Sequence, residues 1–281
     1  MRSSGAIRRL ARHVLMAGAV FAAPAFVVPQ GAMAEVVPQR IVSINLCTDQ
    51  LLLALDLKER LAAVSFLARD HDLSVMWREA QNVPITQASL EGILTLKPDL
   101  VIAGAFGHSR LLGHIERLGI DVLRVADPVS LTDIRQTYLD VGARVGASEV
   151  AEKIAAEIDN VLGTPSRDTD VSALILSPGL LVHADGMLGS SVLAHAGYRN
   201  DAAGQTYLSL EQLALSPPDA LLIAERPNAA PSRAGKLFAH PALQQASRIK
   251  RVPPSALICG TTETARLAAV LADDLRQEVG K

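Results

Sequence analysis

Residues Ser89 to Gly104, SLEGILTLKPDLVIAG, recur near the other end of the chain as Ser209 to Ala224, SLEQLALSPPDALLIA. The two copies align without a gap, and Ser, Leu, Glu, Pro and Asp stand at the same offsets in both. Each copy predicts a helix with serine at its N-cap, a Pro-Asp corner that ends the helix, and a short buried strand. Because a helix followed by a buried strand is half of a right-handed crossover, the repeat predicts two α/β lobes.

The rest of the chain predicts the elements that complete these lobes. An N-terminal lobe at 35–130 is expected from strands at 40–44, 61–66 and 122–125 and from helices at 50–55 and ending near Leu118. A C-terminal lobe at 164–281 is expected from strands at 172–176 and 256–259 and from helices at 189–195, 241–246 and 262–279. The strands are near-continuously apolar, which is typical of parallel sheets covered on both faces.

A helical segment is expected between the lobes, at 131–163. Ser130 should cap a first helix, which Gly146 interrupts, and Ser148 should cap a second helix whose inner face is Val150, Ile154, Ile158 and Val161. A helix of about fifteen residues spans over ~20 Å at a rise of ~1.5 Å per residue. The second helix is therefore long enough to bridge two lobes.

Residues 1–34 have the pattern of a signal peptide. Four arginines precede the apolar stretch Val14 to Val28, and Ala32-Met33-Ala34 offers a cleavage site before Glu35. No cysteine follows that site directly, and no later run predicts a transmembrane helix. We therefore expect an exported protein without a membrane anchor, in the periplasm.

Composition and motifs disfavour several classes of function. A formal net charge of −2, with scattered arginines, provides no basic surface for nucleic acid. The chain contains no G-x-S-x-G, H-E-x-x-H, P-loop or C-x-x-C motif, so no pattern places a nucleophile beside a base. We therefore predict a binding protein and not an enzyme, with no intrinsic cofactor.

The ordered set of motifs resembles the substrate-binding proteins of ABC importers for vitamin B12 and ferric siderophores. The resemblance is carried by R-I-V-S at 40–43, the two S-L-E copies with their P-D corners, and L-G-I-D-V at 118–122. It implies an α/β fold of two Rossmann-like lobes with mainly parallel sheets, joined by a single long backbone helix. It also implies a monomer that holds its ligand between the lobes and delivers it to a permease dimer with a cytoplasmic ATPase.

In the family that the chain resembles, one surface glutamate on each lobe docks into the permease. Glu91 and Glu211 stand at the matching positions of the two repeat copies. A two-fold symmetric partner needs two similar anchors, and the repeat supplies a carboxylate on each lobe. The alternative is that each glutamate only complements the positive end of its helix.

Ligand residues are expected in the loops that follow the strands, because open parallel sheets bind ligands beyond the carboxyl ends of their strands. Arg69 and Arg226 suit an anionic ferric chelate, although each could instead be a surface residue that pairs with Asp70 or Glu225. The candidate residues are Asn45, Cys47, Arg69, His71, Phe106, His108, His183, Tyr207 and Arg226.

Three of these candidates are histidines and two are aromatic. His71, His108 and His183 suit a haem iron or a chelated metal, although each is also an ordinary loop histidine. Phe106 and Tyr207 stand where corrinoid binders of the family carry larger aromatic residues, so this departure counts against vitamin B12. Aromatic residues are 3% of the chain, which is few for stacking on a macrocycle.

The two cysteines, Cys47 and Cys259, lie far apart in the sequence. Export permits a disulfide between them, and two unpaired thiols remain the alternative, because the sequence does not give the distance between them.

These features predict a periplasmic protein that binds an iron chelate of the siderophore type. A corrinoid or haem in the same fold is an alternative. A further alternative is direct binding of zinc or manganese, for which Asp49, His108 and Glu225 are conceivable ligands.

Overall fold

The computed structural model describes residues 37–226 and 233–279, so the predicted signal peptide lies outside the described residues. The N-terminal lobe is built on a sheet in which every paired strand is parallel, in the order β3-β2-β1-β4-β5. Its strands are β1 (Ile41–Ser43), β2 (Leu61–Ser65), β3 (Ile85–Thr86), β4 (Leu100–Gly104) and β5 (Asp121–Val125).

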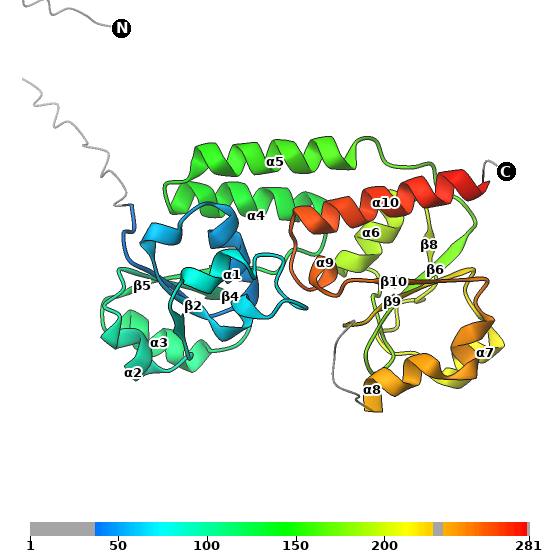
Figure 1. Cartoon of the computed structure of the whole chain (residues 1–281), viewed down its shortest axis with the longest axis horizontal. Helices are drawn as coiled ribbons and strands as arrows, with labels where there is room; N and C mark the ends of the chain where they lie inside the picture. Colours follow the sequence, from blue (N-terminus) through cyan, green and yellow to red (C-terminus); the bar gives the residue numbers. More distant parts are fainter. Residues whose placement is uncertain (1–36, 227–232, 280–281) are drawn as a thin grey trace, which may run out of the picture. The chain divides into compact units, whose positions relative to one another are not determined.

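Helices cover both faces of this sheet (Figure 1). One face packs on α2 (Leu90–Thr95) and α3 (Ser109–Arg117), through a cluster that includes Ile93 and Ile115. The opposite face contributes Ile41 and Ile102 to a larger core with α1 (Leu46–Ala54) and α4 (Leu131–Arg144). The near-continuous apolar strands therefore fit a sheet that is buried on both sides.

The C-terminal lobe has a second sheet in the order β10-β9-β6-β7, with β8 paired to the first two residues of β6. Only β7 runs antiparallel to its neighbour among the described strands. Its strands are β6 (Ser172–Ser177), β7 (Leu181–Val182), β8 (Arg199–Asn200), β9 (Ala220–Ala224) and β10 (Arg248–Val252). Its helices are α6 (Leu188–Ala196), α7 (Leu210–Leu215), α8 (Arg233–Lys236), α9 (Ser255–Ile258) and α10 (Thr262–Val279).

Two helices connect the lobes. The backbone amide of Leu131, at the start of α4, donates to Ser191 of the C-terminal lobe, and the carbonyl of Val145 after α4 accepts from Arg60 of the N-terminal lobe. The long helix α5 (Ser148–Leu162) then lies beside α4 and leads into the C-terminal lobe (Figure 1). A Cβ at Gly142 would lie 2.4 Å from that of Ala151, so the backbone of α4 packs directly on the methyl group of Ala151 in α5.

The repeat has the same local structure in both lobes. Ser89 and Ser209 cap α2 and α7, as predicted. Asp99 accepts from the backbone amides of Gln39 and Arg40 beside β1, while Asp219 accepts from the amide and hydroxyl of Ser172 in β6. The Pro-Asp corner therefore ends a helix and also fixes the first strand of its lobe.

The predicted strand at 256–259 is wrong, because this apolar run forms the short helix α9 and the cysteine that follows it. Pro253 and Pro254 precede the run, and a proline at the start of a helical turn is already in a helical conformation. The last strand is β10, RIKRV. Its three basic residues interrupt the apolar pattern by which a buried strand is recognised. Arg248, Lys250 and Arg251 pair with Glu278, Asp274 and Glu225.

Smaller departures have equally local causes. Strands β3, β7 and β8 have two residues each, which is too short for an apolar pattern. The N-cap of α5 is Ala147 and not Ser148, and the buried face of α5 is formed by Ala151, Ala155 and Ile158. The predicted inner residues Val150, Ile154 and Val161 are only partly buried beside this face.

Candidate functional site

A cavity of about 350 Å³ lies at the carboxyl ends of β6 and β9, where the strand-end rule predicts a ligand site. Most of its wall is apolar, and Leu73 of the N-terminal lobe contributes to it. The polar side chains on the wall are Ser177, His183 and Arg226. A mainly apolar cavity with few polar groups is typical of a site for a small organic ligand.

His183 is a buried part of this wall. Its Nε2 lies 3.3 Å from the hydroxyl of Ser177, and its Nδ1 has no hydrogen-bond partner among the described residues. A Cβ at Gly189 would lie 2.4 Å from that Nδ1, so the glycine makes room for the ring. Desolvation lowers the pKa of His183, which favours a neutral imidazole.

Arg226 connects the cavity to the N-terminal lobe. Its Nη2 donates to Oδ2 of Asp70 at 2.8 Å, across 156 positions of sequence, while its Nε is buried without an acceptor in the described part of the chain. The alternative that Arg226 pairs with Asp70 or Glu225 is thus confirmed for Asp70, whereas Glu225 pairs with Arg251. One nitrogen of the Arg226 guanidinium is therefore bound by Asp70, and Nε remains without a partner within residues 37–226 and 233–279.

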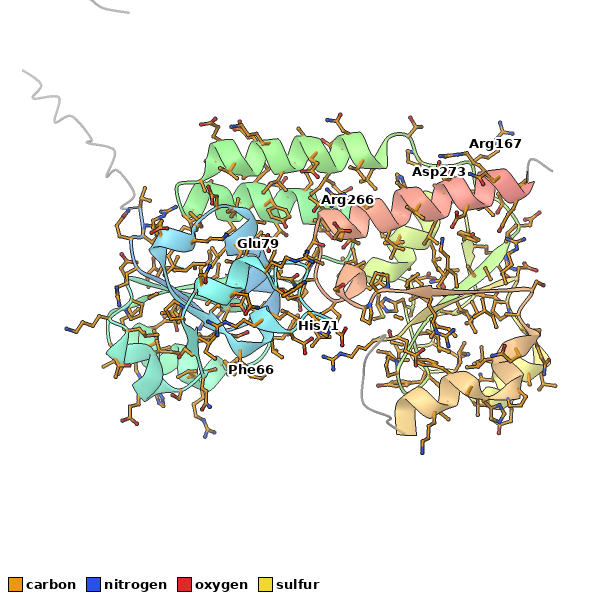
Figure 2. All side chains as sticks on the ribbon, viewed as in Figure 1. Phe66, His71, Glu79, Arg167, Arg266 and Asp273 are labelled. Carbon is orange, nitrogen blue, oxygen red and sulfur yellow. A yellow bond between two sulfur atoms is a disulfide. The ribbon has the colours of Figure 1, made fainter. Side chains whose placement is uncertain are left out.

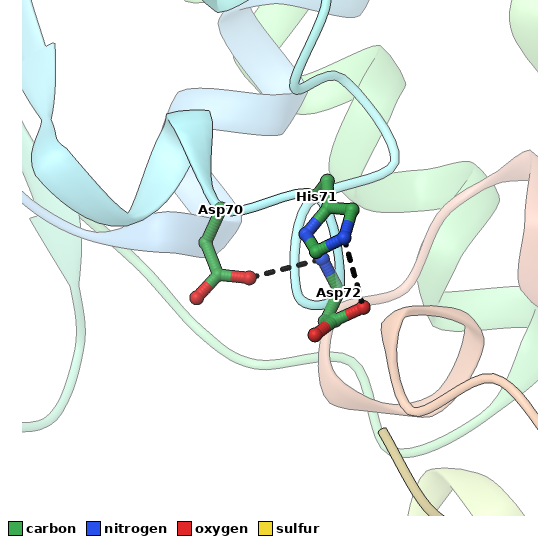
Figure 3. A group of neighbouring side chains, drawn as sticks. All are labelled: Asp70, His71 and Asp72. Carbon is green, nitrogen blue, oxygen red and sulfur yellow. Dashed lines mark hydrogen bonds and ion pairs between the residues drawn. The ribbon is translucent and has the colours of Figure 1, made fainter. Parts of the chain in front are cut away.

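Asp70, His71 and Asp72 form a compact group in the loop after β2 (Figure 3). The imidazole of His71 is 55% exposed, with Nε2 at 3.5 Å from Oδ1 of Asp72. Its ring also meets Trp77 edge-on, with 6.3 Å between the ring centres. Asp70 is already engaged by Arg226 and by two backbone amides, which disfavours a site for a bare metal ion here.

The three residues considered as zinc or manganese ligands do not form a common site. Asp49 is buried and hydrogen-bonded to Ser65, Glu225 pairs with Arg251, and His108 is an exposed residue at the start of α3. None of the three belongs to a group of potential metal ligands among the described residues.

Three other sequence candidates have structural roles. Arg69 donates to the carbonyls of Ala80 at 3.2 Å and Val83 at 2.7 Å, so its guanidinium serves the backbone of its own lobe. The side chain of Asn45 caps α1 by accepting from the amides of residues 47 and 48. Cys47 forms a disulfide with Cys259, with 5.2 Å between their Cα atoms, which settles the alternative that the sequence left open.

Phe106 and Tyr207 are 80% and 65% exposed, and neither contributes to the cavity wall. Phe66, directly after β2, is a further exposed aromatic residue (Figure 2). The apolar wall was not predicted from the sequence. Leu257 and Ile258 were assigned to a strand, and Leu73, Leu181 and Met187 have no pattern that separates them from core residues.

Asp49 is a fully buried carboxyl group at the ends of β1 and β2. Burial raises its pKa from 3.8 to about 6, although hydrogen bonds from Ser43 and Ser65 oppose this rise. The folded chain thus holds a proton on Asp49 that the unfolded chain releases near pH 4. The carboxylate form therefore lowers the stability of the fold, and this cost grows as the pH rises from about 4 to about 6.

We expect Asp49→Asn to raise the free energy of unfolding at pH 7 by about 1–3 kcal/mol. The amide can accept from the Ser65 backbone and donate to its hydroxyl, so the local geometry is retained. Urea denaturation at pH 4, 5, 6 and 7 should show the advantage appearing between pH 4 and 6. An advantage that is equal at all four pH values would contradict the assignment.

Glu91 and Glu211 are exposed in the first turns of α2 and α7. A hydrogen bond from its own backbone amide, together with one from Ser209, lowers the pKa of Glu211 and keeps it charged. Both carboxylates are thus available to a partner. No helix in the described part of the chain is long and apolar enough to cross a membrane.

Comparison with known proteins shows what this fold is similar to. A protein-family model described as "Periplasmic binding protein" matches residues 41–252. Among solved structures, the haem-binding protein RhuT from Roseiflexus sp. RS-1 is 23% identical, with a TM-score of 0.68, covering 85% of this chain and 98% of that one. No curated protein sequence matches the chain.

Two further structures have the same fold. A periplasmic haem-binding protein from Pseudomonas aeruginosa is 23% identical, with a TM-score of 0.66, covering 84% of this chain and 94% of that one. Ceue from Helicobacter pylori, solved with Ni(II) bound, is 16% identical, with a TM-score of 0.64, covering 86% of this chain and 84% of that one. At these identities the likeness concerns the fold alone.

Proposed function

The chain belongs to the periplasmic binding protein family, and from this premise we propose that it captures haem in the cavity at the ends of β6 and β9 and delivers it to an ABC permease. Members of this family bind solutes for ABC importers and are not enzymes. Export through the N-terminal segment 1–34 is part of the proposal.

The observation that carries the choice of ligand is a mainly apolar cavity with a guanidinium on its wall, that of Arg226. Haem combines a flat apolar macrocycle, which such a wall can bury, with carboxylates that a guanidinium can bind. Two of the similar structures, those from Roseiflexus sp. RS-1 and Pseudomonas aeruginosa, are haem-binding proteins, which supports the same ligand.

The ferric siderophore that the sequence placed first remains a prediction. Chelates rich in anionic oxygen are bound best by several cations, and Arg69 is already used by two backbone carbonyls. A corrinoid also remains a prediction.

We assign His71 as the ligand of the haem iron. Its imidazole is exposed, and it belongs to the same loop as Leu73, which borders the cavity. Asp72 lies beside its ring, with Oδ1 at 3.5 Å from Nε2, and can orient the imidazole when the ring binds a metal. His183 is less suited, because its ring is packed against Gly189 and its Nε2 faces Ser177.

Titration of the mature chain with haemin, a ferric siderophore, cobalamin and Zn²⁺ tests the proposal. We expect saturable binding of haemin, seen as a shift of the Soret band and as quenching of Trp77. His71→Ala should weaken haemin binding by about tenfold or more and change the spectrum, because it removes a bond to the iron.

His114→Ala is the matched control, since it removes an exposed histidine from α3. It should leave haemin binding unchanged. A spectrum altered by His183→Ala instead of His71→Ala would reassign the ligand, and binding of Zn²⁺ or of the siderophore alone would refute haem as the substrate.

A further inference from the structure

Arg226 lies between two possible partners, a carboxylate of the protein and the interior of the cavity. Its Nη2 donates to Oδ2 of Asp70, while its Nε is buried and lacks an acceptor in the described part of the chain. A buried guanidinium nitrogen without an acceptor is costly, and a carboxylate that binds the guanidinium fork would satisfy it. The residue is therefore only partly satisfied in the structure.

Asp70 is held in position for this contact by its own loop. Its Oδ1 accepts from the backbone amides of Asp72 at 2.9 Å and Leu73 at 3.2 Å, which leaves Oδ2 for Arg226. Because Asp70 belongs to the N-terminal lobe and Arg226 to the cavity wall of the C-terminal lobe, the carboxylate approaches the guanidinium from the opposite side of the site.

Three other arginines of the described residues have partners of their own. Arg69 binds two backbone carbonyls, Arg251 pairs with Glu225, and the guanidinium of Arg78 lies 4.7 Å from the ring centre of Trp77. A carboxylate that a ligand brings to Arg226 would thus share one guanidinium with Asp70. Two carboxylates at such a short separation repel each other, and the repulsion is strongest where water is partly excluded.

We propose that Asp70 is an internal competitor of the ligand, occupying in the empty protein the place on Arg226 that a carboxylate of the bound ligand takes. Binding exchanges one carboxylate for another on the same guanidinium. Asp70 then keeps its hydrogen bonds within its loop, and its Oδ2 is hydrated by water. The inference rests on the proposed function and refines it. Asp70 determines how tightly a macrocycle that carries carboxylates is held, and it has no such effect on a ligand without them.

Asp70→Asn tests this exchange with little change of shape. The amide oxygen of asparagine can still accept from the amides of Asp72 and Leu73, whereas the charge that competes for Arg226 is removed. The probes are haemin and haemin dimethyl ester, in which both carboxylates are blocked. Dissociation constants are measured by Soret titration of the full mature chain.

We expect Asp70→Asn to bind haemin about fivefold more tightly than the unaltered chain. The variant no longer has to break the Asp70–Arg226 ion pair, and an ion pair of this kind contributes up to ~1 kcal/mol. Binding of the dimethyl ester should not change. Arg226→Gln should weaken haemin binding, and in this background Asp70→Asn should have no further effect, since the group for which Asp70 competes is absent.

Glu225→Gln is the control for general electrostatics, because it removes the same charge one residue from Arg226 but from a carboxylate that pairs with Arg251. Haemin affinity should not rise in this variant. If the unaltered chain binds haemin and Asp70→Asn binds it no more tightly, the inference about Asp70 is wrong, while the proposed function stands. Failure of the unaltered chain to bind haemin would overturn the proposed function together with this inference.

Discussion

Replacing Cys47 and Cys259 together by alanine should lower the free energy of unfolding by about 3–5 kcal/mol. The disulfide closes a loop across 212 positions of sequence, so it strongly restricts the unfolded chain. It also joins the start of α1 in one lobe to the segment between α9 and α10 in the other. Its loss should therefore weaken the attachment of the lobes to each other.

The measurement is urea denaturation of the oxidised chain, the reduced chain and the double variant. The reduced chain and the double variant should have the same midpoint, below that of the oxidised chain, because both lack the same covalent bond. A midpoint that is the same in all three samples would show that the bond does not form or does not stabilise the fold.

The second large effect is expected in transport. Glu91→Ala combined with Glu211→Ala should reduce haem uptake by about tenfold or more and leave haemin affinity unchanged, because charged anchors at an interface determine association with the partner. Both side chains are exposed on corresponding helices of the two lobes, and neither contributes to the cavity wall. In Figure 1, α2 and α7 lie on the side of the sheets away from α5 and α10.

A matched control separates docking from a simple effect on helix stability. Glu149 and Glu263 are also first-turn acids, of α5 and α10, but they stand outside the repeat. Replacing both by alanine removes the same kind of interaction with a helix N-terminus. Normal uptake with this control and reduced uptake with the repeat variant would support docking, whereas normal uptake with both pairs would refute it.

The repeat shows why so much of the fold follows from the sequence. A serine N-cap, a Pro-Asp corner and an apolar run act over a few residues, so they can be recognised without knowing the rest of the chain. Asp99 and Asp219 confirm that the corner has the same role twice. By contrast, β10 is a strand with three basic residues, and two of their partners, Asp274 and Glu278, belong to α10, which no local pattern relates to β10.

The site is less predictable, because its residues are defined by contacts between distant segments. Arg69 and Arg226 are both arginines in loops near strand ends, yet one is used by backbone carbonyls and the other lines a cavity. Likewise, the sequence permitted the bond between Cys47 and Cys259 without establishing it. Arg69 contacts residues 11 and 14 positions away, whereas the Arg226–Asp70 pair and the disulfide span 156 and 212 positions, which no local pattern reveals.

The close approach of α4 and α5 has a consequence for recognition. At Gly142 and Ala151 there is no room for even one additional methyl group, so the pair can hardly slide or bend at this point. We therefore expect the distance between Glu91 and Glu211 to be almost the same with and without bound ligand. A permease that recognises only this span would bind the ligand-free and the ligand-bound protein equally well. Only the loops at the strand ends would differ between the two forms.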